Sequence, residues 1–447
     1  MTPHCQPTMQ TAEPRLRILS PEDLRRLDAA ALHVLASVGV AMPSARAREA
    51  LAAAGAETDG DIVRIPAGVV RRLVGLAPAR MRLGARAGDT LVTGERPLLT
   101  TDGCCTEIFD LQTGERRSTT GDDVGAISRL VDALPEIDFC WPAVSAQDHP
   151  SDRRGLQELY LALANTGKHV QTVTVVEPDL ARAAVEMART VAGDDARLRA
   201  ASPVSALLGT VTPLGNDEGT LEAGLVFAEA GVPIGFVTMP MGGSTTPITM
   251  AGSLVVGIAE ALSAVAVVQT IAPRAEVFIC FIPSIMDLKT GDFTGGAPED
   301  TVMAAAVADI GRFYGLPTQC GVNASGAKTP GWQSAVDDVS TTFVSLLAGV
   351  DMLGGVGMVA GGRVFSFEEM VLAAEVTAVS REAAGGLRPG RRPASPAADA
   401  LIGRQAAAGA GALAHARERA RHLIATHTPP PLADDVDREL RRFVAGA

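Results

Sequence analysis

Short apolar runs alternate with longer segments of helical periodicity along most of the chain. Eight runs are rich in aliphatic residues and show little polar alternation, which is typical of parallel strands buried on both faces. Each is followed by a turn rich in Gly, Pro, Thr or Asp. The runs are residues 98–104, 138–144, 169–176, 204–213, 233–240, 276–284, 317–323 and 351–359.

The segments between these runs have the length and the start signals of helices. Gly121-Asp122-Asp123 and Pro298-Glu299-Asp300 place acidic side chains in a first turn, where they suit the helix dipole and the free N–H groups. Strands that alternate with helices favour right-handed parallel crossovers, and eight such units close a sheet without edges. The pattern therefore predicts an α/β fold, a (β/α)8 TIM barrel over residues 98–386. An open doubly wound sheet is the alternative.

Two accessory regions flank the predicted barrel. Residues 1–97 are expected to be a mostly helical N-terminal region, with a helix start at Ser20-Pro21-Glu22-Asp23. Residues 387–447 are expected to form a C-terminal linker and a helical tail. In this tail, Pro429-Pro430-Pro431 ends one helix before a last helix begins near Val436.

Charge and composition exclude several classes of protein. The net charge is -12 and no basic stripe is present, which argues against nucleic-acid binding. Gly252, Gly257 and Glu260 interrupt the apolar stretch 250–272, which indicates a buried barrel helix and not a membrane span. The six cysteines form no CxxC pair and no secretory segment precedes the barrel. We therefore expect reduced core cysteines in a cytoplasmic protein, and a homo-oligomer.

Catalytic residues of such a barrel lie at the C-terminal ends of its strands. The side chains expected there include Asp102, Trp141, Asp287 and Asn323, but no HxH, HExxH or Cys-His cluster. His169 falls at the start of a strand, on the opposite face. We therefore expect no bound metal, and no GxSxG elbow is present either.

The loop with most polar and glycine residues spans positions 239–250 and reads MPMGGSTTPITM. Gly242 and Gly243 allow close backbone approach, and Ser244 offers a hydroxyl at the start of a long helix. The loop is either an anion site at a helix N-terminus or a tight strand-to-helix turn.

This loop and other segments over most of the chain resemble the trimethylamine methyltransferase family. Pro240 with Gly242 and Gly243, Met286-Asp287 with Gly291, and Gly296 with Pro298-Glu299 fall in the order and spacing of that family. The resemblance extends to ASGAKTPGWQSAVDD, to LLAGVDMLGGVGMV, to the opening RILSPEDLRRLDAAALHVLASVGV and to the closing RERARHLIATHTPPPL.

The resemblance implies a TIM-barrel enzyme that transfers a methyl group from an amine to the Co(I) of a corrinoid protein. The founding members carry pyrrolysine inside the barrel, which this chain lacks. Members without it are similar enzymes for quaternary amines such as glycine betaine. A quaternary ammonium already has a neutral amine as leaving group, so the protein needs only to orient and desolvate it. We expect a small-molecule quaternary amine and a partner protein that supplies the corrinoid (cobalamin).

A betaine pocket needs one end for the cation and one for the carboxylate. Aromatic faces and carboxylates suit the cation, which favours Trp141 with Asp102 or Asp287; barrel packing is the alternative for Trp141. Amide and amine donors suit the carboxylate. The catalytic candidates are Asp102, Asp287 and Asn323, and the substrate-binding candidates are Trp141, Gly242, Gly243, Ser244, Lys328 and Gln333.

A corrinoid is too large to enter a closed pocket, so the mouth of the barrel is expected to be an open funnel. We expect Gly242, Gly243, Asp287 and Asn323 near its floor.

The loop after the seventh predicted strand differs from the family pattern. Gly326 and Gly331 stand where the family usually has acidic residues, Asp337 stands in place of a glutamate, and residues 406–413 are rich in alanine. Two alternatives to the quaternary-amine methyltransferase therefore remain open. One is a diverged family member with another methyl donor, and the other is a non-catalytic betaine-binding barrel.

Overall fold

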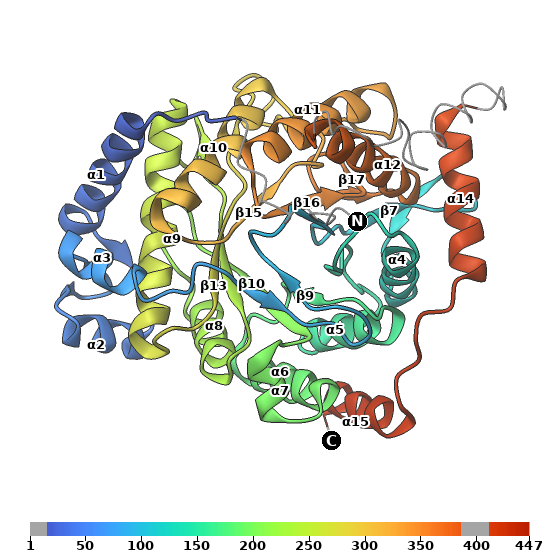
Figure 1. Ribbon diagram of the computed structural model, residues 1–447, viewed down its shortest axis with the longest axis horizontal. Coiled ribbons are helices and arrows are strands. Elements are labelled where there is room, and N and C mark those ends of the chain that lie inside the picture. Colours follow the sequence, from blue (N-terminus) through green and yellow to red (C-terminus); the bar gives the residue numbers. More distant parts are fainter. Residues whose placement is uncertain (1–15, 386–410, 447) are drawn as a thin grey trace, which may run out of the picture.

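A closed parallel barrel occupies the centre of the computed structural model, which describes residues 16–385 and 411–446 (Figure 1). Seven of its strands form one sheet in the order β6-β16-β15-β13-β11-β10-β9, and all neighbouring pairs are parallel. The strands are β6 (Leu98–Thr101), β9 (Val170–Thr172), β10 (Val204–Gly209), β11 (Ile234–Thr238), β13 (Val277–Phe281), β15 (Thr318–Gly321) and β16 (Met352–Val356).

The eighth segment closes the barrel through single bridges. Phe139 bridges to Thr100 of β6, and Cys140 bridges to Val170 of β9, both in the parallel direction. The strand expected over residues 138–144 is thus reduced to these bridging residues, while the predicted (β/α)8 barrel is confirmed.

Helices form an outer ring around the barrel (Figure 1). A short extra helix, α7 (Asp195–Ala200), follows α6. The ring consists of α4 (Gly121–Ala133), α5 (Arg154–Asn165), α6 (Pro178–Ala192), α8 (Glu218–Ala230), α9 (Met250–Ile271), α10 (Pro298–Tyr314), α11 (Trp332–Ala348) and α12 (Phe367–Ala384).

Helix α9 is apolar on nearly all sides because two layers cover it. Its inner side packs on β11 and β13, and α1 (Pro21–Ser37), α2 (Ala45–Ala53) and α3 (Ala67–Val74) cover its outer side. Within the described residues it is the one helix long and apolar enough to cross a membrane, and 78% of its apolar window is buried. A helix that is hydrophobic all round is typical of such a core position.

The small strands β1 (Val40–Ala41), β2 (Glu57–Asp59) and β3 (Ile62–Arg64) join the N-terminal helices. A second hairpin, β4 (Arg82–Leu83) with β5 (Leu91–Val92), closes the N-terminal end of the barrel. Its side chains Met81 and Leu83 pack in the interior with Phe139 and Phe278. A Cβ at position 235 would lie 2.2 Å from the Phe278 ring, so Gly235 makes room for this packing.

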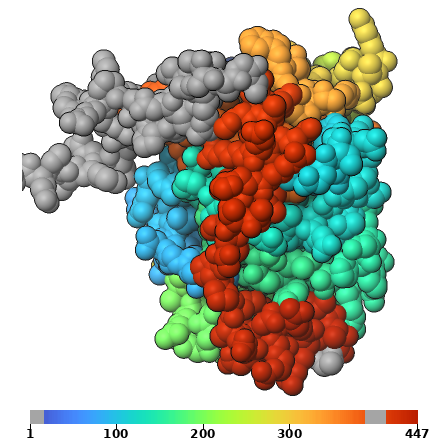
Figure 2. Space-filling model, turned by 90° about the vertical axis from the view of Figure 1, so that its right-hand side faces the viewer, coloured from blue at the N-terminus to red at the C-terminus, as the bar shows by residue number. Residues whose placement is uncertain are grey.

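Two C-terminal helices cross the outside of the ring (Figures 1 and 2). α14 (Ala412–Thr426) packs on α12 and α4, the last and first helices of the ring, and α15 (Asp434–Ala445) packs on α5 and α6. These agree with the helices expected in the tail, while the expected linker up to residue 410 lies outside the described residues.

Two small sheets lie beyond the C-terminal ends of the barrel strands. β12 (Met241–Gly242) pairs with β14 (Ser284–Ile285). The other sheet has the order β17-β18-β7-β8, with β7 (Glu107–Phe109), β8 (Arg116–Ser118), β17 (Met358–Val359) and β18 (Val364–Phe365). Both build up the wall of the barrel mouth.

Candidate active site

The carboxyl group of Asp102 lies on the floor of the barrel mouth, directly after β6. A Cβ at Gly354 would lie 2.7 Å from Asp102 Oδ2, and one at Gly321 would lie 3.7 Å from it. The carboxylate therefore extends over the inner ends of β15 and β16, in space that these glycines leave free. Gly209 at the end of β10 is exposed and has nothing within 4 Å of an added Cβ, so the floor is open on that side.

Asp102 has no ion-pair partner among the residues that the structure describes. Its side chain is 3% exposed and accepts a hydrogen bond from the Gly103 N–H at 2.5 Å. Burial raises the pKa of this carboxyl to about 7, which the Gly103 N–H only partly opposes. A cation beside it would favour the ionised form. Asp102 is thus suited to exchange a proton for a bound cation near neutral pH.

Trp141 lies in the barrel interior and packs among Phe139, Leu207, Phe278 and Cys280. The hydroxyl of Thr101 donates to the Trp141 carbonyl at 2.6 Å and accepts from its N–H at 3.0 Å. Its side chain is 3% exposed, and Nε1 has no oxygen acceptor among the described residues; the Cys104 thiol is its neighbour in the mouth. Trp141 is therefore a packed core residue whose indole donor lacks an oxygen acceptor in the described chain.

Cys104 is a residue of the mouth that the sequence analysis did not single out. It was expected in the core with the other cysteines, but it is exposed; Cys105, Cys140, Cys280 and Cys320 are buried, and Cys5 lies outside the described residues. The residue is exposed, but its thiol is turned into the barrel: desolvation there, with the carboxylates of Glu158 and Asp102, raises the pKa of the Cys104 thiol to about 12, and a hydrogen bond with the Trp141 side chain only partly opposes this. This thiol therefore stays protonated at neutral pH.

A buried acidic side chain from a barrel helix holds several loops of the mouth. Glu260 of α9 accepts hydrogen bonds from the hydroxyls of Thr210 and Thr212 and from the Leu214 N–H, at 2.8 to 2.9 Å. Burial raises its pKa. Glu158 of α5 and Asp300 of α10 bind neighbouring loops in the same way. Sequence reasoning missed these contacts because an acidic residue in a helix is usually solvated.

The glycine loop lies on the rim of the mouth and not on its floor. β12 and β14 continue β11 and β13 outward, with Gly242 opposite Ile285. Gly243 has φ +87°, and an added Cβ would lie 3.2 Å from Leu288. Ser244 is exposed and its N–H donates to the Met241 carbonyl. The expectation that Gly242 and Gly243 lie near the floor is wrong, because the strands end earlier than their apolar runs.

Hydroxyl groups of this loop bond mainly within the loop. Thr245 accepts from the Met241 N–H at 3.2 Å, and Thr249 accepts from the Gly252 N–H at 3.2 Å as the cap of α9. Of the two interpretations of the loop, these contacts favour the strand-to-helix turn.

Asp287 also lies in the rim, where it closes a turn. Its carboxylate accepts from the Lys289 N–H at 2.9 Å and from the Thr290 hydroxyl at 3.1 Å. These hydrogen bonds lower its pKa. The expected position of Asp287 near the floor is therefore wrong as well.

Two of the three candidates for a substrate carboxylate are engaged elsewhere. The third, Asn323, is fully buried: its oxygen accepts from the Thr342 hydroxyl at 2.6 Å, and its amide nitrogen has no hydrogen-bond partner among the described residues. Lys328 lies 3.5 Å from Asp292 and its side chain is 68% exposed. Gln333 donates to Asp337 Oδ1 at 2.8 Å. The structure thus places Asp102 and Trp141 inside the barrel, and it leaves Lys328 and Gln333 at exposed positions.

Large apolar side chains are exposed around the mouth. They belong to the loops after β10, β11 and β13 and to the start of α11. Trp332 is 84% exposed, an unusual value for a tryptophan. The others are Val211 (54%), Met239 (50%), Ile248 (56%) and Leu288 (63%). Together with Trp332 they are called the apolar rim below, and such patches commonly mark interaction sites.

No group of three or more His, Cys, Asp or Glu side chains suited to a metal is found within residues 16–385 and 411–446. His169 is buried at the N-terminal end of the barrel, where its ring contacts the Gly84 carbonyl and the Ser205 hydroxyl, each at 2.8 Å. Burial lowers its pKa to about 4. That the protein binds no metal remains a prediction.

Comparison with known proteins gives a consistent result. The family described as trimethylamine methyltransferase (MTTB) matches residues 1–407. Trimethylamine methyltransferase MttB of Desulfitobacterium hafniense is 30% identical over 373 residues, which cover 82% of this chain and 75% of that protein. MttB of Methanosarcina thermophila is 28% identical over 380 residues, covering 83% and 79%. A glycine betaine methyltransferase of D. hafniense is 26% identical over 367 residues, covering 81% and 76%.

A solved structure has the same fold. Monomethylamine methyltransferase MtmB of Methanosarcina barkeri superposes with a TM-score of 0.54 over 95% of this chain and 85% of that chain. The identity is 13%, so this likeness concerns the fold alone.

Proposed function

Because the chain belongs to the trimethylamine methyltransferase family, we propose that it is an enzyme that moves a methyl group from a quaternary amine of the glycine betaine type, or from a methylamine, to the Co(I) of a corrinoid protein. The relatives support methyl transfer from an amine. The observation that carries the proposal in this chain is Asp102, a buried carboxyl group with no cationic partner in the described residues.

The floor of the mouth fits a methylated cation. A quaternary ammonium donates no hydrogen bond, so its recognition depends on charge and on apolar contact. Asp102 supplies the charge when ionised, and Trp141 with the neighbouring side chains of the barrel supplies an apolar wall. Gly209 leaves room for a ligand against β10, and Gly321 and Gly354 leave room for the Asp102 carboxylate itself. Bound in this way, the amine is oriented and separated from water.

The apolar rim fits a partner that carries the cofactor. When docked, the Co(I) corrinoid would supply the nucleophile that takes one methyl group, and the amine that has lost this methyl group would leave in neutral form. The floor is reached only past the rim, and an exposed tryptophan such as Trp332 is the kind of side chain that anchors protein interfaces.

The contacts of Lys328 and Gln333 favour a second candidate, a diverged member with another methyl donor. Lys328 is exposed beside Asp292 and Gln333 donates to Asp337, so neither side chain is directed to the floor by its contacts. A donor without a carboxylate, such as a simple tetraalkylammonium, needs no such contact.

Incubation with Co(I) cobalamin and a panel of amines tests these alternatives. The panel contains glycine betaine, choline, tetramethylammonium and trimethylamine, and methylcobalamin formation is followed by absorbance. Turnover of glycine betaine supports the first candidate, and turnover of tetramethylammonium alone supports the second. Saturable betaine binding without any turnover would support a non-catalytic betaine-binding barrel and contradict the proposal.

A further inference from the structure

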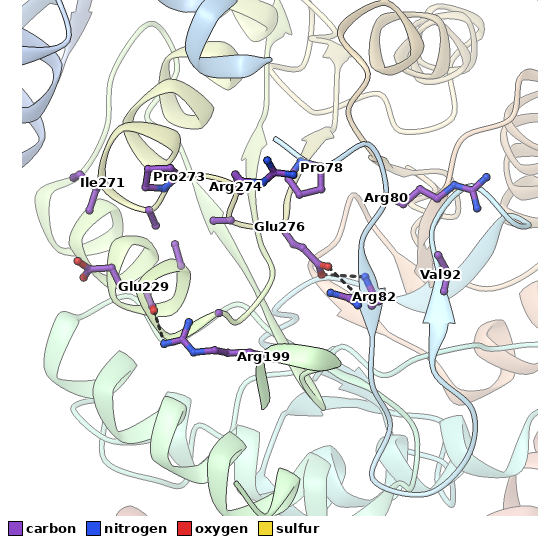
Figure 3. Close-up of a pocket in the computed structure, with 14 residues that line it drawn as sticks. Pro78, Arg80, Arg82, Val92, Arg199, Glu229, Ile271, Pro273, Arg274 and Glu276 are labelled. Carbon is purple, nitrogen blue, oxygen red and sulfur yellow. Dashed lines mark hydrogen bonds and ion pairs between the residues drawn. The ribbon is translucent and has the colours of Figure 1, made fainter. Parts of the chain in front are cut away.

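A second pocket, of about 880 Å3, lies at the opposite end of the barrel from the mouth (Figure 3). It is bounded by the β4–β5 hairpin, by the C-terminal ends of α7 and α8, and by the turn from α9 into β13. These segments surround the N-terminal ends of the barrel strands. The pocket is therefore separate from the proposed methyl-transfer site.

The hairpin that seals the barrel also presents two arginines to this pocket. Residues 80–83 read Arg-Met-Arg-Leu, and side chains alternate between the two faces of an extended segment. Met81 and Leu83 are fully buried in the barrel interior. Arg80 and Arg82 are exposed and line the pocket.

The charges of the pocket are only partly balanced. Arg82 is paired with Glu276, with Nε 3.2 Å from Oε1 (Figure 3). Glu229 forms an ion pair with Arg46, outside the pocket lining. Arg80, Arg199 and Arg274 have no carboxylate partner in the described part of the chain. The lining is thus positive in a protein whose net charge is -12.

Arg199 and Arg274 reach the pocket from different elements. Arg199, in the last turn of α7, donates one hydrogen bond to the Glu229 carbonyl at 3.2 Å, and its other guanidinium donors have no partner in the described residues. Arg274 lies beside Pro78 (Figure 3). Arginine forks of this kind match the oxygens of phosphate groups.

The backbone at Arg274 is held in a conformation that favours glycine. Its φ is +70°, which is unfavourable for a side chain such as arginine. The fully buried Gln269 fixes the turn: it accepts from the Arg274 N–H at 2.7 Å and donates to the Ala275 carbonyl at 2.9 Å. Glycine would form this turn with less strain, so the turn itself does not account for an arginine here.

We propose that this pocket binds an organic phosphate of nucleotide size. The guanidinium groups of Arg199 and Arg274 would bind the phosphate oxygens, and the apolar surface of Pro78, Ile271 and Pro273 would contact the organic part. The volume lies within the range of small-molecule sites, about 300 to 1,000 Å3. This inference is independent of the proposed methyl transfer, because the two sites lie at opposite ends of the barrel.

Calorimetry with ADP, at constant ionic strength, tests the proposal. We expect saturable binding of ADP and binding at least about tenfold weaker for adenosine, which lacks the phosphates. Arg274→Gly and Arg199→Ala should each weaken ADP binding by about tenfold. Arg25→Ala removes an exposed arginine of α1 and serves as the matched control, with unchanged binding.

Arg274→Gly separates binding from folding, because it relieves the unfavourable φ and should leave the melting temperature equal or higher. The proposal is overturned if ADP shows no saturable binding, if adenosine binds as well as ADP, or if Arg274→Gly binds ADP like the wild type. It is also overturned if the wild type binds no ADP and forms an oligomer that Arg274→Gly dissociates, because the pocket would then be an interface between copies.

Discussion

Asp102 and Trp141 are buried in the barrel, and each has a polar group that the described residues leave unpaired. Both side chains are 3% exposed, yet among the described residues the Asp102 carboxyl has no cation beside it and the Trp141 indole N–H has no oxygen acceptor. Interior polar groups are normally paired, and unpaired ones are common at functional sites. These two residues are therefore the places where substitutions are most informative.

Asp102→Asn should make the folded protein more stable at pH 8. Burial raises the folded-state pKa of Asp102 from 3.8 to about 7. Protonation is therefore favoured by folding: the contribution of this group to stability is largest below pH 3.8 and is lost as the pH rises to 7. The neutral asparagine avoids this loss, so the gain at pH 8 is about 2 to 4 kcal/mol. Chemical denaturation at pH 4 and pH 8 measures the free energy of unfolding of both proteins. A difference between Asp102→Asn and the wild type that is equal at the two pH values would contradict the assigned pKa.

Trp141→Leu and Trp141→Phe separate packing from ligand contact. Leucine leaves part of the barrel interior empty, so we expect a loss of about 2 to 4 kcal/mol in the free energy of unfolding. Phenylalanine keeps a ring and removes only the unpaired N–H, so the loss should be below about 1.5 kcal/mol. If Trp141 also contacts the substrate cation, leucine weakens its binding by a further 0.5 to 2 kcal/mol, roughly. Unchanged ligand binding in a destabilised Trp141→Leu would leave packing as its only role.

Among the elements, the C-terminal helix α14 joins the last and the first helix of the outer ring. It packs on α12 and α4, and Arg417 pairs with Glu368 at 2.6 Å. Ala416 and Ala420, one helical turn apart, are fully buried and allow close approach to the ring. α14 therefore covers the seam where the last βα unit meets the first.

Ala420→Leu should loosen this contact. The larger side chain has no space at the interface, so we expect a loss of about 1 to 3 kcal/mol in stability. Ala414→Leu adds the same atoms at an exposed position of the same helix and should change stability by less than about 0.5 kcal/mol. Hydrogen exchange should rise in α4 and α12 only in Ala420→Leu, and equal behaviour of the two variants would contradict a fastening role for α14.

The elements that the sequence predicted well are those defined by local periodicity. The apolar runs located seven barrel strands, and acidic first turns located helices such as α4 and α10. The strand predicted near Phe139 was too long. Its apolar residues are buried where the barrel closes, but only single bridges join them to the neighbouring strands. Contacts such as those of Glu260 with the loop after β10 depend on residues far apart in the chain, and no local pattern contains them.

The candidate site was also predictable only where local sequence patterns define it. Asp102 and Trp141 follow directly from strand ends, whereas Gly242 and Asp287 were placed wrongly because their strands continue outward as β12 and β14. The exposure of Cys104 depends on the shape of the mouth, which only the assembled barrel defines.

In the whole molecule, the floor would bind the amine and the apolar rim would bind the partner that carries the corrinoid. Trp332→Ala should therefore slow methyl transfer to a corrinoid protein about tenfold or more through weaker docking, and leave transfer to free Co(I) cobalamin unchanged. Steady-state rates with both acceptors measure this difference. A loss that is equal for both acceptors would show that Trp332 supports the fold or the floor and not a docking surface.

We propose that the Asp102 carboxylate on the barrel floor holds the methyl-donating cation. Single-turnover methyl transfer to Co(I) cobalamin, with the amine that the panel identifies, tests it most directly in the wild type, Asp102→Asn and Asp89→Asn. Asp89 is exposed in the hairpin at the opposite end of the barrel, so its variant removes the same charge without touching the mouth. We expect Asp102→Asn to lose about a hundredfold in rate at low amine concentration, equivalent to about 3 kcal/mol, and Asp89→Asn to match the wild type. Equal rates in all three proteins, or no methylcobalamin with any amine, would contradict the claim.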